Sequence, residues 1–296
     1  MIFFVASSFE SVTGLPVIVG YILSFVFGSA VGSFLNVVIH RVPREQSIVF
    51  PNSACPKCSK PIKPYDNIPI LSWLVLGGKC RGCSAPISIR YPAVEFLTGM
   101  LWVLVFWQTG LSPLLPVGFI FVSVTVALMF IDAEHMILPN VITYPFAVFA
   151  FAVRILFPMF FAGAYFADTA LWPMNLMTGY PAWLISLTGA LLGAAAGGGS
   201  LWLVGELWKR LRGVEAMGLG DVKMMIGFGA LLGWRSAVLA IFIGAFAGAV
   251  IGMSLIAIKK DKDMQTQIPF GIFLGIGSVA AYFFGDRLVT WYLGYF

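Results

Sequence analysis

Charged residues are scarce in this chain of 296 residues: Asp, Glu, Lys and Arg make up 10%, against 59% hydrophobic residues. A soluble domain usually carries about a quarter charged residues. The composition therefore excludes a water-soluble globular protein and indicates one that has lipid as its main solvent. Because the apolar runs are continuous and lack the alternation of a membrane barrel strand, we expect them to be helical.

A long basic stripe interleaved with aromatic residues is also missing, so the net charge of +5 does not indicate a nucleic-acid partner. Most Lys and Arg stand in short segments between apolar runs, which is how orientation in a membrane is set. The residues before the first apolar run, 16–39, include no Lys or Arg, whereas a signal peptide begins with a basic region. The run is also longer than the apolar part of a signal peptide. We expect this run to be retained as the first helix.

Eight hydrophobic segments have about the length that crosses a bilayer, although the sixth is short and Gly-rich. They cover residues 16–39, 92–108, 114–131, 139–157, 182–205, 221–234, 236–258 and 270–292. The sequence therefore predicts an all-α polytopic membrane protein with about eight transmembrane helices, surrounded by lipid. The stretch 158–181 is apolar but broken by Pro and Gly, and we expect it to be a loop near the membrane surface.

Basic residues are divided unevenly between the two sides that eight spans create. Arg154, Arg235 and Arg287 fall on one side, and the other fifteen Lys and Arg fall on the opposite side. Positively charged loops stay in the cytoplasm, so both termini are predicted outside and the polar stretch 41–91 inside. We expect a first transmembrane helix in 1–40, a cytoplasmic four-Cys domain in 41–91 and a transmembrane domain in 92–296.

Glycines recur four residues apart in two of the segments, and small residues at this spacing let helix backbones approach closely in lipid. Close packing is therefore favoured over a gating hinge as their role. The positions are Gly189, Gly193 and Gly197 in one segment, and Gly244, Gly248 and Gly252 in another.

All four cysteines lie in the polar stretch, as Cys55-Pro-Lys-Cys58 and Cys80-Arg-Gly-Cys83. Each pair can present two thiolates at one corner of a tetrahedron, and two pairs close a structural zinc site. Two disulfides are the alternative, but disulfides do not persist in a reducing cytoplasm. A thioredoxin-like redox pair would need a βαβ pattern, which is missing. The sequence predicts a small zinc-ribbon-like domain whose metal has four ligands and no catalytic role.

Two acidic residues stand at the ends of apolar segments, where ionisable groups are costly and indicate function. Asp132 closes the third segment and Asp221 opens the sixth, and the predicted topology places both at the cytoplasmic edge of the membrane. Two carboxylates that meet in a low-dielectric site cannot both ionise easily, so one holds a proton while the other acts as a base. We predict that Asp132 and Asp221 form an aspartic-protease pair that activates water.

The segment before Asp221 supports this interpretation. Gly218 and Gly220 are expected to give the backbone unusual conformations and to let an extended substrate approach, with Lys223 as a further supporting residue. Structural alternatives stay open: Asp132 caps a helix or pairs with Lys223, and Asp221 is an ordinary N-cap. Serine-protease Gly-x-Ser-x-Gly and zinc-protease His-Glu-x-x-His motifs are both missing.

Motifs spread over nearly the whole chain resemble those of the type 4 prepilin peptidases, bacterial inner-membrane leader peptidases of type IV pilus and type II secretion systems. The matching residues are Gly32 to Pro43, Cys55 to Cys58, Asp66 to Pro69, Gly78 to Cys83, Arg90 to Pro92 with Glu95, Asp132 with Pro139, Gly218 to Lys223, and Pro269 to Gly271.

The resemblance implies two activities. The first removes the short basic leader of prepilins or pseudopilins at the cytoplasmic face, with Asp132 and Asp221 matching the family's catalytic pair. The second methylates the new N-terminal amine with S-adenosylmethionine, whose binding residues the sequence does not reveal. Asn140 departs from the family pattern, which often has Asp there, so no third carboxylate is expected at that position.

Two other classes of function remain as alternatives. In a membrane transporter, Asp132 and Asp221 would relay protons, but no convincing inverted repeat is present. In a non-enzymatic assembly platform, the zinc loop would dock a partner.

Overall fold

The computed structural model describes residues 9–161, 179–214, 217–258 and 269–294, without the side chains of 255–258 and 293. Over these residues the regular structure is helical, and strand pairing is limited to two isolated bridges. The chain divides into two compact units, 1–127 and 128–296, and the division falls within one helix, α5. The all-α prediction is confirmed.

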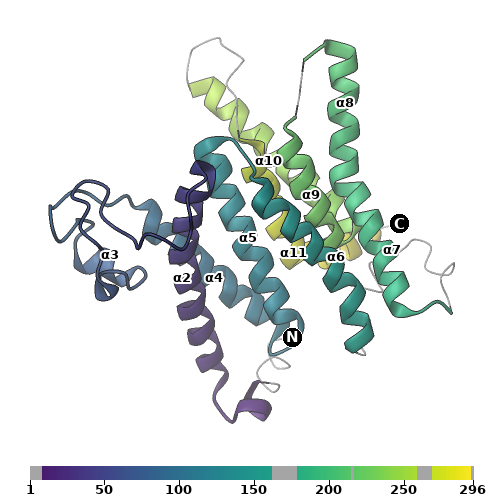
Figure 1. Ribbon diagram of the computed structural model, residues 1–296. Coiled ribbons are helices and arrows are strands. Elements are labelled where there is room, and N and C mark those ends of the chain that lie inside the picture. The colour runs from purple at the N-terminus through teal and green to yellow at the C-terminus, as the bar shows by residue number, and fades with distance from the viewer. Residues whose placement is uncertain (1–8, 162–178, 215–216, 259–268, 295–296) are drawn as a thin grey trace. The chain divides into compact units, whose positions relative to one another are not determined.

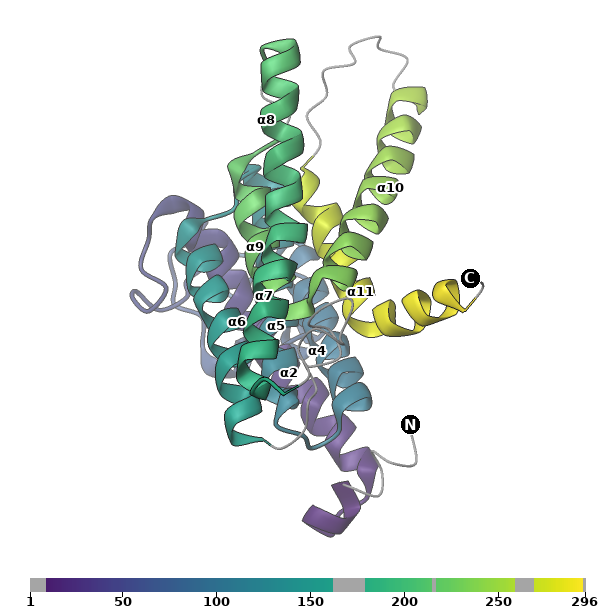
Figure 2. The same ribbon diagram turned by 90° about the vertical axis from the view of Figure 1, so that its right-hand side faces the viewer.

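A helix covers each of the eight predicted segments, and one short helix lies in the polar stretch (Figure 1). In chain order they are α2 (Val17–Arg41), α3 (Leu71–Val75), α4 (Arg90–Thr109), α5 (Leu114–His135), α6 (Asn140–Phe160), α7 (Ala182–Ala194), α8 (Ser200–Arg212), α9 (Leu219–Leu232), α10 (Trp234–Ile258) and α11 (Phe270–Leu293). A π-helical turn, Ala195–Gly199, joins α7 and α8 into one rod (Figure 2).

Six of the described helical stretches are long and apolar enough to cross a membrane: α2, α5, α6, the α7–α8 rod, α10 and α11. Helix α9 has only 14 residues, about 21 Å at 1.5 Å per residue, against a hydrocarbon core of about 30 Å. The polytopic prediction is confirmed, while the count of eight crossings stays a prediction. The expected loop 158–181 lies mostly outside the described residues, and its first residues continue α6 to Phe160.

In the first unit, α2 and α4 pack side by side (Figure 1). Glycines of α2 make the contact close, because a Cβ atom at Gly32 would lie 2.7 Å from Cα of Glu95. A Cβ atom at Gly28 would lie 2.8 Å from Cβ of Trp102. The Trp102 ring in turn stacks on Phe119 of α5, with centroids 3.9 Å apart.

In the second unit, α9 contacts α6, α7, α10 and α11. The approach of α7 to α9 depends on Gly193 and Gly229, since a Cβ atom on either would lie 2.0 or 2.1 Å from the carbonyl oxygen of the other. Helices α10 and α11 meet similarly, where a Cβ atom at Gly244 would lie 2.8 Å from the carbonyl oxygen of Phe273. The close packing predicted for Gly193 and Gly244 is confirmed.

Candidate active site and cysteine cluster

Asp132 and Asp221 line one open pocket in the second unit. Asp132 lies in the last turn of α5 and Asp221 in the first turn of α9, and their exposed fractions are 6% and 8%. The structure therefore brings together two carboxylates that are distant in the sequence. The pocket has a volume of about 260 Å³, and its other lining residues are Met136, Ile137, Leu138, Gly220 and Lys223.

The chain ends α5 directly after the turn that carries Asp132. Met136 follows the helix with a φ of 52°, the left-handed conformation that commonly ends helices. Its N–H donates to the carbonyl oxygen of Asp132 at 2.9 Å. Pro139 then stands at the N-cap of α6, where its fixed φ suits a helix start. The short link between the helices, 136–139, thus forms one wall of the pocket.

Gly220 lets this link pack against α9. A Cβ atom at Gly220 would lie 2.9 Å from Cβ of Leu138, whereas one at Gly218 would meet nothing closer than 3.6 Å. The prediction of unusual backbone conformations here is wrong: Gly218 is the N-cap of α9 with φ −72° and ψ 138°, and Gly220 is helical. Asp221 is the third residue of α9, so it is not an N-cap.

The Asp132 carboxylate faces the N-terminus of α11. Pro269 is the N-cap of that helix and provides no side-chain cap, while the backbone N–H groups of Gly271 and Ile272 interact with Asp132. A helix N-terminus favours a negative group. Among the described residues, Oδ2 of Asp132 has no hydrogen-bond partner, and it is buried against Gly271 of α11.

Lys223 is held at the edge of the pocket by α6. Its Nζ donates to Oδ1 of Asn140 at 2.9 Å and lies 5.2 Å from the centroid of the Tyr144 ring. The alternative that Lys223 pairs with Asp132 does not match this arrangement, because the ammonium is directed to Asn140. The amide oxygen of Asn140 thus accepts a hydrogen bond from Lys223. At this position the prepilin peptidases that the chain resembles often have Asp.

The four cysteines form a cluster in the first unit. Their Sγ atoms all lie within 4.8 Å of one another, and no disulfide joins them. Sγ of Cys55 and Sγ of Cys83 are 3.8 Å apart. Tetrahedral zinc with Zn–S bonds of about 2.3 Å requires sulfur atoms about 3.8 Å apart. The donor set and its spacing therefore fit zinc.

Each Cys-x-x-Cys pair is built on the same backbone turn. The N–H of Cys55 donates to the carbonyl oxygen of Lys60, and the N–H of Cys80 donates to that of Ala85, at 3.0 and 2.8 Å. Ser59 and Ser84, directly after each pair, both have a φ of 56°. The two turns are knuckles of one design, although the described residues lack the strands of a complete ribbon.

Backbone N–H groups prepare these knuckles for a cation. The N–H groups of Cys58 and Lys57 lower the pKa of the Cys55 thiol, and the N–H of Gly82 donates to Sγ of Cys80 at 3.4 Å. Both contacts favour the thiolate, which is the form that binds metal. Although the N–H of Ala85 lowers the pKa of the Cys83 thiol, burial and the neighbouring cysteines together raise it, so without a cation the four sulfur atoms do not all ionise together. With all four positions filled by protein sulfur, a bound zinc ion would hold the knuckles together without an open site for chemistry.

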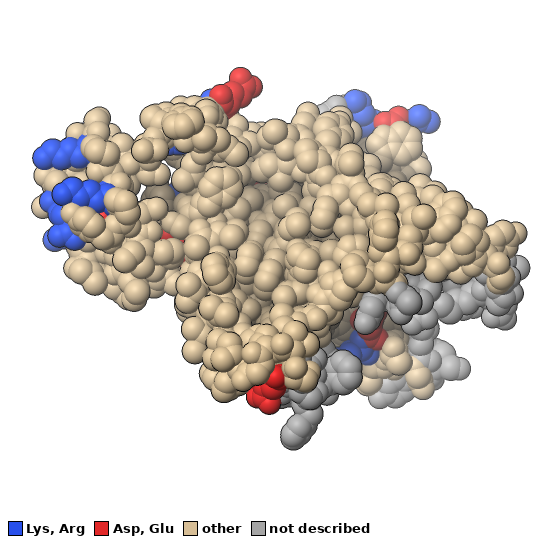
Figure 3. Space-filling model, turned by 60° about the horizontal axis from the view of Figure 1, so that its bottom comes forward, with Lys and Arg blue, Asp and Glu red and all other residues tan. Residues whose placement is uncertain are grey.

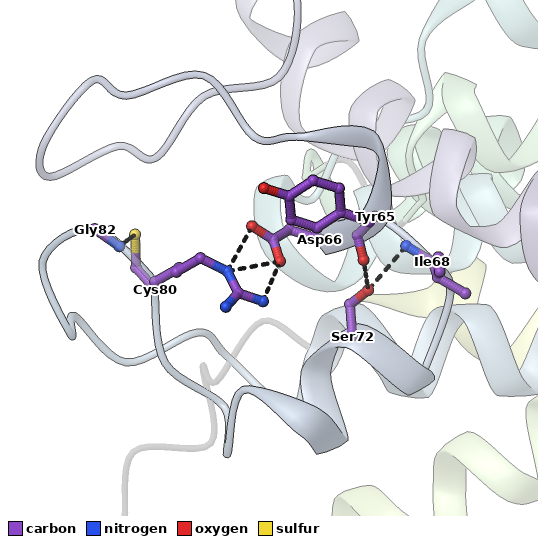
Figure 4. A network of polar contacts seen from close by, with 7 residues as sticks. Tyr65, Asp66, Ile68, Ser72, Cys80 and Gly82 are labelled. Atoms are coloured by element: carbon purple, nitrogen blue, oxygen red, sulfur yellow. Dashed lines mark hydrogen bonds and ion pairs between the residues drawn. The ribbon is translucent and has the colours of Figure 1, made fainter.

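Arg81 joins the second knuckle to the segment 64–66. It makes three contacts of 2.7 to 3.0 Å with the carboxylate of Asp66 (Figure 4). This guanidinium lowers the pKa of the Asp66 carboxyl. Asp66 belongs to a motif that carried the family resemblance, and its structural role is to fasten the cysteine cluster to the rest of the polar stretch.

Comparison with known proteins identifies the family. The model for the bacterial peptidase A24 N-terminal domain matches residues 26–109, and the model for the type IV leader peptidase family matches residues 119–253. A prepilin leader peptidase/N-methyltransferase of Aeromonas hydrophila is 37% identical, covering 96% of this chain and 97% of the relative. The chain belongs to the type IV leader peptidase family.

Two further relatives of this chain are also named prepilin leader peptidase/N-methyltransferase. The protein of Pseudomonas aeruginosa is 34% identical over 91% of this chain and 92% of its own length. That of Neisseria gonorrhoeae is 35% identical over 92% of this chain and 94% of its own length. No solved structure matches the chain.

Several residues that the structure makes conspicuous were not assigned a role from sequence. Gly271 was noted only as part of a motif, and Asn140 only as a departure from the family. Arg154 was counted as a charge near the outer loops, but it lies within α6 and is fully buried. No local pattern indicated this burial, because α6 is apolar on most of its surface.

Proposed function

We propose that this protein is an intramembrane aspartyl endopeptidase that removes the leader of type IV prepilins or type II secretion pseudopilins. The observation that carries the proposal is that Asp132 and Asp221, from two separate helices, line one pocket. Family membership supports it, because the relatives from Aeromonas hydrophila and Pseudomonas aeruginosa are named prepilin leader peptidases.

The two carboxyl groups act as a pair in the proposed reaction. A water molecule between them gives a proton to the ionised carboxylate as its oxygen attacks the peptide carbonyl. The protonated carboxyl donates its hydrogen to the carbonyl oxygen, giving a tetrahedral diol. As the C–N bond breaks, the leaving amine takes a proton from the protonated carboxyl, and one hydroxyl of the diol gives its proton to the ionised carboxylate as the C=O bond re-forms. The pair is then again left with one proton. The pocket that both carboxyl groups line has a volume of about 260 Å³, which is room enough for this water.

The neighbours of the pair support its position in this proposal. The first turn of α11 faces Asp132, and the first turn of α9 contains Asp221, so each carboxylate lies near the positive end of a helix. Gly220 admits Leu138 to the pocket wall. Lys223 places a cation at the rim, where it can donate a hydrogen bond to the carbonyl group of an extended substrate.

We also propose the second activity, transfer of a methyl group from S-adenosylmethionine to the amine that cleavage exposes. Its support is the second half of the relatives' names, N-methyltransferase. The neutral amine is the nucleophile: the new N–C bond forms as the S–CH3 bond breaks, S-adenosylhomocysteine leaves with the electron pair on sulfur, and the methylated amine loses a proton to water. We assign no residue to the methyl donor.

We also propose how the protein is arranged in the membrane. Eight membrane crossings, with residues 41–91 and the aspartate pocket facing the cytoplasm, suit the distribution of Lys and Arg. The proposed location of the protein is the bacterial inner membrane, as the resemblance to prepilin peptidases implies. The four cysteines would bind structural zinc within 41–91, between the first transmembrane helix in 1–40 and the peptidase domain in 92–296.

Substituting each aspartate separately tests the catalytic role. Purified full-length Asp132→Asn and Asp221→Asn variants receive a precursor peptide and S-adenosylmethionine, and cleavage and methylation are followed by mass spectrometry. Each variant should lose at least a thousandfold in cleavage rate while retaining its melting temperature. Each should still methylate a peptide that already has a free mature N-terminus.

Glu134→Gln is the matched control, because Glu134 is exposed and only two residues from Asp132. It should cleave at nearly the wild-type rate. Wild-type cleavage by both Asn variants would overturn the proposal and favour a non-enzymatic platform. Loss of proton flux in proteoliposomes without loss of cleavage would favour a transporter.

A further inference from the structure

The short helix α3 and the residues before it turn apolar side chains outward. Ile68, Leu71, Leu74 and Val75, which we call the α3 face, have exposed fractions of 48%, 59%, 60% and 81%. In a soluble domain, the apolar side of a helix packs inward. A contiguous apolar surface that the described residues leave uncovered marks an interaction site.

Polar contacts fix the opposite side of α3. Oγ of Ser72 accepts from the N–H of Ile68 at 2.9 Å and donates to the carbonyl oxygen of Tyr65 at 3.0 Å (Figure 4). Nε1 of Trp73 donates to the carbonyl oxygen of Ile87 at 3.0 Å. Because Ser72 and Trp73 are pinned inward, the apolar side chains of the helix are held outward.

A hydrogen bond to α4 sets the level of α3 along the helices. The N–H of Ile70, directly before α3, donates to Oε2 of Glu95 at 2.7 Å. Glu95 is the sixth residue of α4, about 8 Å along the axis from the start of that helix at 1.5 Å per residue. Helix α3 therefore begins beside the second turn of α4. It lies alongside α2 and not beyond the end of that helix (Figure 1).

Cations adjoin the α3 face. Nζ of Lys63 and Cζ of Arg81 lie 5.6 and 5.8 Å from the centroid of the Tyr65 ring. Tyr65 and Arg81 also line a hollow of about 90 Å³ together with Leu71 and Val75. Figure 3 shows Lys and Arg gathered on the lobe that this region forms. The acidic residues of 41–91 are only Glu45 and Asp66, and its exposed cations include Lys57, Lys60, Lys63, Lys79 and Arg81.

We propose that the α3 face is inserted into the bilayer interface, with Lys63 at the phosphates of anionic lipid headgroups and Arg81, which is paired with Asp66, beside it. An apolar surface flanked by cations is the combination that binds anionic membranes, and Tyr is typical of the interfacial layer. Helix α2 is long and apolar enough to cross a membrane, and α4 packs against it and is joined to the start of α3 by the hydrogen bond from Ile70 to Glu95. The α3 face is therefore tied to a pair of helices that includes a candidate membrane span. The contact is independent of the proposed catalytic function.

Photo-crosslinking identifies the occupant directly. Benzoyl-phenylalanine replaces Val75 in the full-length protein, and in a second sample it replaces Asn52, an exposed polar residue of the same region. Both proteins are placed in nanodiscs of phosphatidylcholine with or without 30% phosphatidylglycerol, and also irradiated in bacterial membranes. Adducts are identified by mass spectrometry.

The expected result is a phospholipid adduct at position 75 with at least five times the yield at position 52, increased by phosphatidylglycerol. Lys63→Glu should remove most of the phosphatidylglycerol effect, as should high salt. Equal lipid yields at both positions, or none at position 75, would overturn the proposal. A protein adduct at position 75 in bacterial membranes without a lipid adduct would also overturn it and assign the face to a protein partner.

Discussion

A Cβ atom on Gly271 would lie 2.8 Å from Oδ2 of Asp132 and 3.1 Å from its Cγ. The first turn of α11 therefore packs so closely on the Asp132 carboxylate that position 271 has no room for a side chain. This contact explains in physical terms why a glycine stands directly after the helix start, where its low helix propensity would otherwise be a cost.

Gly271→Ala should impair cleavage by displacing either Asp132 or the start of α11. We expect the rate of precursor cleavage to fall at least tenfold, with a small change in melting temperature. Gly205→Ala is the matched control, because its Cβ atom would meet nothing closer than 3.7 Å and Ala is the better helix former. Equal cleavage by both variants would contradict the proposed role of the contact.

Gly218 and Gly220 should respond differently to the same substitution. Gly220→Ala brings Cβ within 2.9 Å of Cβ of Leu138, so the pocket wall must move and cleavage should fall at least tenfold. Gly218→Ala adds a methyl group where φ is −72° and the nearest atom is 3.6 Å away. Its cleavage rate should stay within about threefold of wild type, allowing for a weaker N-cap. Steady-state kinetics on one precursor peptide distinguish the two; the reverse order would mean that backbone freedom at Gly218 matters after all.

Asn140 should affect cleavage through Lys223. Asn140→Ala removes the acceptor of the Lys223 ammonium, whereas Asn140→Asp keeps an acceptor oxygen and should preserve activity better. In a double-mutant cycle with Lys223→Met, the activation free energies should couple by about 1 kcal/mol, the usual net value of a hydrogen bond. Val141→Ala, an exposed neighbour, serves as the control. Additive effects would show that the contact has no part in catalysis.

The cysteine cluster should bind one zinc ion per chain. Cys80→Ser should remove most of the metal, because a serine hydroxyl is a poor substitute for a thiolate. Elemental analysis measures the zinc, and hydrogen exchange of residues 53–87 measures the loss of structure that we expect with it. Ser84→Gly is a suitable control, since glycine accepts the φ of 56° at that position. Full zinc content in the Cys80→Ser variant would contradict the four-ligand site.

Hydrophobic runs predicted the helices well because lipid leaves the backbone of such a run few options except helix. The cysteine spacing likewise predicted the cluster, since Cys55 and Cys83 can meet only if the two knuckles fold together. The aspartate pair was predicted from the position of Asp132 and Asp221 at the ends of two segments, and the pocket contains both.

Long-range contacts were the part that the sequence did not reveal. The hydrogen bond from Lys223 to Asn140 and the approach of Gly271 to Asp132 join helices that are far apart in the chain. Local patterns contain no information on such pairs. The wrong prediction for Gly218 and Gly220 has the same cause: the need for glycine at position 220 comes from Leu138 of another segment, not from the local backbone.

The shortness of α9 has a consequence for how a substrate reaches the pocket. A helix of 14 residues is about 21 Å long, which is about 9 Å less than the thickness of a hydrocarbon layer of about 30 Å. The end that bears Asp221 and Lys223 is polar, so the shortfall is best accommodated there by water or by local thinning of the bilayer. Because α9 is enclosed by α6, α7, α10 and α11, a membrane-anchored precursor would reach this aqueous notch from the open side of the pocket. Its backbone would lose there the apolar surroundings that favour helix. Unwinding and hydration of the scissile segment would thus begin at the same place.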